Sequence, residues 1–349
     1  MSNTYLLNDT PIRTSVSYKM NDLTMKDLYL PESKREFVNV ETSYSNVTVK
    51  DVTVFKGLTY GVGKVLEESM SKYCNSSFGI YSEEADGNFL VNYLFDDTNT
   101  ELSNYIEINA DKDMNVTIIF KSNTNKACHH NFIINTDVKN EAKVHLEIIN
   151  LLNEETNHFI SIENKVEDNS ELELILADMG AKYSVSNMYS DLVGKNSVIE
   201  TNTIYIGQNE SVKDINYVAH LKGKKSVADM DLQGVLDDRS KKYLKFTIDF
   251  KTGCTKASGS ESESCMLLSD DVTYRSLPIL LCTEDDVEGA HSAAAGQVDK
   301  GQLFYLMSRG IEKKEATKML VKAKYNEIIE KLTDESLKKE ILAEVDRRL

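Results

Sequence analysis

Alternation of apolar and polar residues dominates the chain between residues 77 and 298. It is clearest in three stretches that each begin at a polar turn: DKDMNVTIIF (111–120), KNEAKVHLEI (139–148) and EDNSELELIL (167–176). A period of two predicts strands with one buried face. The apolar residues recur at a spacing of 28, twice: Val116, Ile118 and Phe120, then Val144, Leu146 and Ile148, then Leu172, Leu174 and Leu176.

The repeat continues at Val198, 26 residues after Leu172, and then at spacings of 14, 15 and 17 with Val212, Val227 and Leu244. Turn–strand units that recur at such a period favour stacked coils, because one unit cannot bury its apolar face alone. A sandwich or barrel is the alternative, but it needs hairpins. Asp86-Gly87 is the one two-residue hairpin signal of its kind. A mainly β fold, with a β-solenoid favoured over a sandwich, is therefore the prediction from the pattern.

The flanking regions have a different pattern. Residues 1–76 are mixed and contain one helical stretch, Val62–Tyr73, whereas residues 299–349 are charged and helical. The sequence thus predicts three segments: 1–76, a β core at 77–298, and a helical segment at 299–349. No role is evident for the first.

Three amphipathic helices are expected in the last segment. Asp299 caps the first, which ends at Arg309-Gly310, and the second spans Lys313–Leu332. The third starts at Thr333 or Asp334. On the second helix the predicted apolar stripe comprises Ala316, Met319, Leu320, Ala323, Ile328 and Ile329. The helices form either a cap on the solenoid or a docking surface for another protein.

Composition narrows the possible environments. The net charge of −16 argues against nucleic acid as a partner, because phosphate binding depends on Lys and Arg. No apolar run is long enough for a membrane span, and no signal peptide is recognisable. The five cysteines (Cys74, Cys128, Cys254, Cys265 and Cys282) are scattered, which argues against a disulfide framework. A cytoplasmic location is expected.

Candidate chemistry is sparse. Residues 57–65, GLTYGVGKV, lack the spacing of a phosphate-binding loop. Cys128-His129-His130 contains metal-ligand types, but alternation turns His129 away from the other two, and a structural role is favoured. His145, His158 and His220 are interpreted as structural. Glu261, Glu263 and Cys265 share one strand face, which we interpret as a solvated acidic face. Without a catalytic constellation, the chain is not expected to be an enzyme.

His291 stands out because its neighbours from Gly289 to Gly296 have minimal side chains. Small residues permit close approach of another backbone, and an imidazole can offer a nitrogen ligand near neutral pH. An interface or a buried site is therefore expected around this histidine.

The stretch from Pro278 to Ile311, PILLCTEDDVEGAHSAAAGQVDKGQLFYLMSRGI, strongly resembles the SufB/SufD family of iron–sulfur cluster assembly proteins. The resemblance implies a right-handed parallel β-helix with small N-terminal and helical C-terminal segments. It also implies pairing with a SufB-like subunit through the last β-helix strands. The C-terminal helices would recruit a SufC-type ABC ATPase, and the residues expected to contact it are Leu303, Phe304, Tyr305, Met307, Arg309, Gly310, Ile311 and Met319.

Within that family the sequence resembles SufD more than SufB. The residues beside His291 are Ala290 and Ser292, where SufB-like sequences have glutamate on both sides. The resemblance assigns His291 to iron or a transient cluster at the subunit interface, with no permanently bound cofactor. Glu263 occupies the position of the SufB-like cluster cysteine, and Cys265 lies two residues beyond it.

Two other interpretations remain open. In the first, the chain is a SufB-like scaffold that holds the nascent cluster itself as a homodimer, using Cys265. In the second, it is a β-helix enzyme acting on polysaccharide, against which the missing secretion signal counts. A further departure from many SufD sequences is Gly289, which replaces a cysteine.

Overall fold

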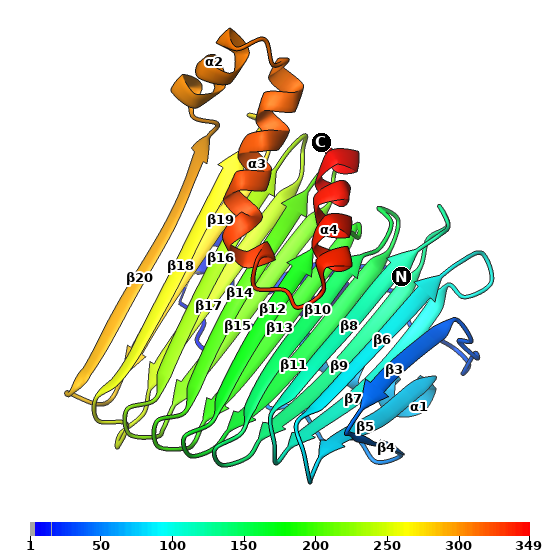
Figure 1. Cartoon of the computed structure of the whole chain (residues 1–349), viewed down its shortest axis with the longest axis vertical. Helices are drawn as coiled ribbons and strands as arrows, with labels where there is room; N and C mark the ends of the chain where they lie inside the picture. The colour runs from blue at the N-terminus through cyan, green and yellow to red at the C-terminus, as the bar shows by residue number, and fades with distance from the viewer. Residues whose placement is uncertain (1–3, 15) are drawn as a thin grey trace.

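The computed structural model describes residues 4–14 and 16–349, and it contains 50% strand and 15% helix. Its body is a β-solenoid of about 8 turns with helices near the C-terminus (Figure 1). Successive turns pair in parallel along two sheets. This arrangement confirms the solenoid and excludes the sandwich, because a sandwich of hairpins pairs its strands antiparallel.

Each turn contributes one strand to each sheet. From the open edge, sheet I contains β20 (Val287–Gln297), β18 (Ala257–Leu267), β16 (Val227–Leu236), β14 (Val198–Gly207), β12 (Glu171–Asp178), β10 (Lys143–Leu151), β8 (Met114–Ser122), β6 (Gly87–Phe95) and β3 (Val40–Ser45). In the same order, sheet II contains β19 (Thr273–Cys282), β17 (Lys241–Phe250), β15 (Val212–Leu221), β13 (Tyr183–Leu192), β11 (Asn157–Val166), β9 (His129–Val138), β7 (Glu101–Ala110), β5 (Ser76–Ser82) and β4 (Thr48–Asp51).

The predicted inward residues of the three clearest repeats are all buried, as the alternation required. The register confirms the spacing of 28 between β10 and β12. The register corrects two of the predicted equivalences between turns. Val116 pairs with Leu146 and not with Val144, and Leu172 pairs with Ile199 and not with Val198. The shorter spacings of 14, 15 and 17 separate consecutive strands, which lie in opposite sheets. Turns of unequal length between the strands cause the offsets, and residue spacing alone does not reveal them.

Two helices cover the outer face of sheet I, whereas the helix before them projects past the strand ends (Figure 1). The C-terminal helices are α2 (Lys300–Ser308), α3 (Lys313–Ile329) and α4 (Glu335–Arg348). The predicted caps are confirmed: Asp299 accepts a hydrogen bond from the amide of Gln302, and Asp334 accepts one from the amide of Ser336. Gly310 ends the first helix at φ +87°. No helix in the described part of the chain is long and apolar enough to cross a membrane.

The buried face of α3 differs from the predicted stripe. Val321 and Tyr325 are fully buried, whereas Met319 is 47% exposed. Tyr325 determines this orientation, because its hydroxyl donates a 2.5 Å hydrogen bond to the backbone oxygen of Tyr205 in β14. Helical periodicity alone does not predict such a specific contact with a distant strand.

The segment before the core covers the outer face of sheet II. The predicted helix there is confirmed as α1 (Lys64–Tyr73), which packs on this sheet together with the antiparallel pair β1 (Thr4–Leu7) and β2 (Leu23–Lys26); a short 3-10 turn, η1, spans Val16–Tyr18. The division at residues 76 and 298 stays a prediction. β3 and β4, which precede residue 76, already pair with the two sheets.

A buried ion pair fastens this segment to sheet II. Lys245 in β17 and Asp214 in β15 lie 2.6 Å apart and are almost fully buried. Asn8 caps the pair: its amide donates to the Asp214 carboxylate at 2.6 Å, and its backbone oxygen accepts from Lys245. Burial of the pair is tolerable because these hydrogen bonds replace those to water.

The interior of the solenoid, which we call the lumen, contains two histidines on adjacent turns. The Nδ1 atoms of His130 and His158 are hydrogen-bonded at 2.8 Å. The Nε2 atom of His130 lies 2.8 Å from the side-chain oxygen of Asn104. Burial lowers the pKa of His130, and it lowers the pKa of His158 to about 4. Both rings are therefore neutral in the folded protein near pH 7.

We predict a specific pH dependence from this pair. The unfolded chain takes up protons on these histidines below about pH 6.5, and the folded chain does not. The free energy of unfolding should therefore fall as the pH drops from 6.5 toward 4, by up to about 1.4 kcal/mol per pH unit for each histidine. His158→Gln should lose less stability over this range. Denaturant titrations at a series of pH values measure the difference, and a difference that does not vary with pH would contradict the prediction.

Candidate functional site

The solenoid ends at β20, the open edge of sheet I (Figure 1). Among the described residues, β20 pairs with β18 alone, and all residues of β20 after Val287 are exposed. The small side chains noted in the sequence therefore lie on an uncovered strand. Such an edge presents unpaired backbone N–H and C=O groups to a further strand.

His291 lies in the middle of this strand and faces the lumen. It pairs in register with Glu261 of β18, which is an inward-facing residue. Neighbouring strands lie about 4.8 Å apart, so the imidazole and the carboxyl start from adjacent positions on one face. His291 is exposed because no further turn covers the end of the lumen.

Glu261 is 1% exposed, and neither of its carboxyl oxygens has a hydrogen-bond partner among residues 4–14 and 16–349. Burial raises its pKa to about 8; the backbone of Ile248 offsets this in part, without reaching hydrogen-bond geometry. The interpretation of Glu261, Glu263 and Cys265 as a solvated acidic face is therefore wrong. The face is internal, because the neighbouring turn and sheet II enclose it.

Glu263, two residues along the same face, is fully paired. It forms an ion pair with Lys242 of β17, and the side chains of both are buried completely. The hydroxyls of Tyr205 and Tyr274 each donate to its carboxylate at 2.7 Å. Lys242 also lies 3.9 Å from the centre of the Tyr274 ring. These contacts compensate the charge of the carboxylate and hold it in place, and a role for Glu263 at the cluster site stays a prediction.

Cys265 is also buried, at 3% exposure. Burial raises the pKa of its thiol to about 11, so the protonated form dominates at neutral pH. Gly234, its register partner in β16, leaves room for the Tyr205 ring, since a Cβ on this glycine would meet that ring at 1.9 Å. Cys265 pairs in register with Ala295 of β20, four residues along that strand from His291.

The space around Gly289 is limited. A Cβ at this position would lie 3.2 Å from the ring of Phe250 and 3.4 Å from the side chain of Leu280. A side chain at this position would therefore require the Phe250 ring of the opposite sheet to shift by a few tenths of an ångström.

Metal-ligand types elsewhere are dispersed. Among residues 4–14 and 16–349, no group of three or more His, Cys, Asp or Glu side chains is arranged to hold a metal ion. In the Cys128-His129-His130 cluster, Cys128 and His130 are buried, whereas the ring of His129 stacks on Tyr29 at 3.8 Å. The opposite orientation of His129 follows from the alternation.

The predicted partner-binding residues cluster on α2 and the start of α3. Phe304 is 73% exposed and Tyr305 57% exposed, and no residue of α2 is buried. The guanidinium of Arg309 lies 5.3 Å from the centre of the Tyr305 ring. The members of this surface that are exposed are Phe304, Tyr305, Met307, Arg309, Gly310 and Met319, whereas Leu303 and Ile311 are partly buried.

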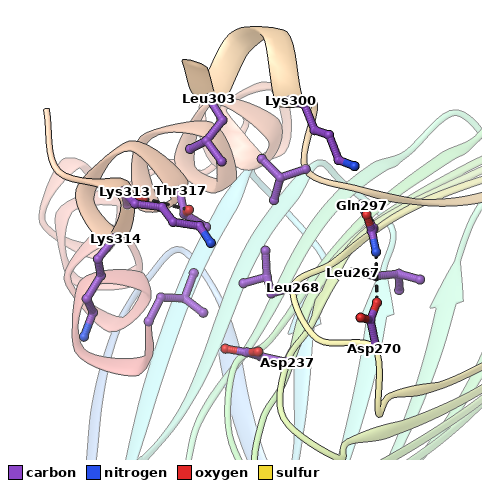
Figure 2. A pocket seen from close by; sticks show the side chains of 12 residues that line it. Asp237, Leu267, Leu268, Asp270, Gln297, Lys300, Leu303, Lys313, Lys314 and Thr317 are labelled. Atoms are coloured by element: carbon purple, nitrogen blue, oxygen red, sulfur yellow. Dashed lines mark hydrogen bonds between the residues drawn. The ribbon is translucent and has the colours of Figure 1, made fainter. Parts of the chain in front are cut away.

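A groove separates α2 and α3 from the strand-end turns of sheet I (Figure 2). Its volume is about 560 Å³. Leu303 points into it from α2, opposite Leu267 and Leu268, and three lysines stand along its helical side. Beside β20, the side chain of Gln297 donates a 2.9 Å hydrogen bond to Asp270 at the edge of the groove. α2 thus turns the partly buried Leu303 toward the groove and leaves Phe304 exposed to solvent.

Lys242, Tyr205 and Tyr274 were not predicted. One signal was available for Lys242, since it shares the inward parity of Leu244 and Phe246 in KKYLKFTIDF. A lysine at an inward position predicts a buried acidic partner. Pairing with Glu263 depends on which turns face each other, and the register that decides this is not evident from the sequence.

Comparison with known families agrees with this architecture. Residues 93–324 match the family model described as SUF system FeS cluster assembly, SufBD core domain. The chain belongs to the SufBD family. The resemblance of residues 278–311 to this family is confirmed.

Among relatives in this family, SufD proteins stand out. The chain is 26% identical over 261 residues to the iron–sulfur cluster assembly protein SufD of Bacillus subtilis, which covers 74% of this chain and 60% of that protein. It is 29% identical over 164 residues to SufD of Escherichia coli, covering 47% of this chain and 38% of that protein. A SufBD family protein of Pyrococcus horikoshii is 33% identical over 130 residues. The match covers 37% of this chain and 29% of that protein. The chain is a SufD-like member of the family and spans less than two thirds of these relatives.

We predict that the Lys242–Glu263 pair is required for stability. Lys242→Met leaves a buried carboxylate without its cation and should lower the free energy of unfolding by about 3–5 kcal/mol. Lys241→Met, on the exposed side of the same strand, is the control and should change stability by less than about 0.5 kcal/mol. Denaturant unfolding measures both. Equal effects of the two substitutions would contradict the prediction.

Proposed function

We propose that the chain is a SufD-type subunit of a cytoplasmic SUF scaffold that handles iron or a nascent cluster at a subunit interface. In this proposal its open edge pairs with a SufB-type subunit, and its C-terminal helices recruit a SufC-type ATPase. His291 contributes a ligand at the shared interface. ATP hydrolysis belongs to the ATPase partner, and the chain itself is not an enzyme. Iron or the cluster passes through as cargo and is not a resident cofactor.

The observation that carries the proposal is the uncovered strand β20. It is 11 residues long and exposed from Glu288 to Gln297, and it has a free hydrogen-bonding side. Long, flat edges are rarely left open in monomeric proteins, because they template association. Its small residues supply little side-chain bulk to obstruct a second sheet edge. These features support strand-to-strand pairing with another subunit.

The surface of α2 supports a second contact. It presents Phe304, Tyr305 and Met307 to solvent next to Arg309, and aromatic residues, methionine and arginine are enriched at protein interfaces. α2 projects past the strand ends, away from the lumen (Figure 1). The two surfaces therefore lie on different parts of the chain, which is consistent with simultaneous binding of two partners.

The homodimeric SufB-like scaffold is less well supported. It needs a reactive thiol near His291, and Cys265 is buried with a raised pKa. Thiolate is the form that ligates iron. Edge pairing of two identical chains remains compatible with the open strand and is one outcome of the binding experiment.

We expect Phe304→Ala combined with Tyr305→Ala to abolish binding of the ATPase and to leave binding of the SufB-type subunit intact. Both side chains are mostly exposed, so the folded chain should keep its stability. Co-purification of the three proteins, with thermal unfolding of the variant alone, provides the measurement.

Tyr44→Ala is the matched control, because that tyrosine is 56% exposed on β3, at the end of sheet I opposite β20. It should leave both interactions unchanged. Retention of the ATPase by the double variant would contradict the assignment of α2, and failure of the wild-type chain to bind either partner would contradict the proposed function.

A further inference from the structure

The unexplained group in the lumen is the carboxyl of Glu261. It lies at the last covered turn, is 1% exposed, and has no hydrogen-bond partner for either oxygen. Burying a carboxyl without a partner costs several kcal/mol, so an unpaired one in a native fold calls for an explanation. Its neighbour Glu263 shows that this lumen can provide partners, since that carboxylate has a lysine and two tyrosines.

The surroundings of Glu261 leave one direction open. Its register partner on the inner side is Met230 of β16, which is buried and apolar. Toward the open end of the solenoid, Glu261 pairs in register with His291 of β20. No strand follows β20 in the described residues. The series of inward residues at this position runs Leu146, Leu174, Thr201, Met230, Glu261 and His291. Two metal-ligand types therefore follow a stack that is apolar except for Thr201, just where the lumen opens.

We propose that Glu261 and His291 together form a two-residue binding site for a divalent first-row metal ion, ferrous iron in the scaffold. Imidazole nitrogen with carboxylate oxygen is a donor set that ferrous iron accepts. The inference rests on the proposed role of His291 and adds Glu261 as the oxygen ligand from the same chain. Two ligands leave coordination positions free, and the chain that covers β20, or water, supplies the rest.

This division of labour explains why the two lumen glutamates differ. Glu263 is held by Lys242 and is unavailable to a cation. Glu261 has no cationic partner among the described residues, and a metal ion beside His291 would supply one. The pair is built into adjacent strands of one sheet, which positions the ligands without help from a flexible loop.

Cobalt(II), whose visible absorption reports nitrogen and oxygen ligands, is the probe for this site in the full-length chain. Glu261→Gln and His291→Ala should each weaken cobalt binding by at least about tenfold, whereas Glu288→Gln should change it by less than about twofold. Glu288 lies on the outer side of β20 and is the control for replacing a glutamate with glutamine near the site. Cobalt should raise the thermal midpoint of the wild type and of Glu288→Gln, because a ligand stabilises the state that binds it.

The outcomes separate the inference from the proposed function. Loss of binding in His291→Ala together with wild-type binding in Glu261→Gln overturns the role of Glu261 and retains that of His291. No cobalt binding by the wild type at about 1 mM overturns the site for both residues and leaves the partner-binding surfaces to their own test. If Glu261→Gln weakens association with the SufB-type subunit and not cobalt binding, the carboxyl is an interface hydrogen-bonding group and the metal site is wrong.

Discussion

Hydrogen bonding between successive turns is the interaction on which the rest of the molecule depends. Each strand of a parallel solenoid satisfies its backbone groups through the turn before it and the turn after it, so the last turn necessarily lacks one neighbour. Parallel sheets also need cover on both faces. Here the lumen residues fill the inside, α3 and α4 cover the outside of sheet I, and the N-terminal segment covers sheet II. The uncovered end is therefore a consequence of the architecture, and we propose that the functional surface lies there.

The lumen changes character toward that end. The early turns are filled with apolar and aromatic side chains, with the His130–His158 pair among them. The last turns place Glu261, Glu263 and Lys242 inside the same narrow space. Charged groups are costly there unless they are paired, and the Lys242–Glu263 network meets that requirement. Glu261 has no such partner among the described residues, and we propose that its partner is external to the chain.

Much of this could be predicted from the sequence, for reasons that differ by element. Alternation places Val116 and Leu146 inside, because one strand face is always buried, and the caps at Asp299 and Asp334 mark helix starts by local chemistry. The register between turns could not be predicted, because the lengths of the turns vary. For the same reason the pairing of Lys242 with Glu263, and of Glu261 with His291, was not evident. Glu261 was interpreted as solvated because alternation indicates which residues share a face but not whether that face is inside.

The central claim is that β20 is the edge at which a SufB-type subunit completes the solenoid. Hydrogen–deuterium exchange of the chain, alone and with that subunit, tests it most directly. The account predicts that amides of residues 287–297 exchange rapidly in the isolated chain and become strongly protected in the complex, with little change at β8 and β10. A stable complex in which residues 287–297 exchange as fast as in the isolated chain would contradict it.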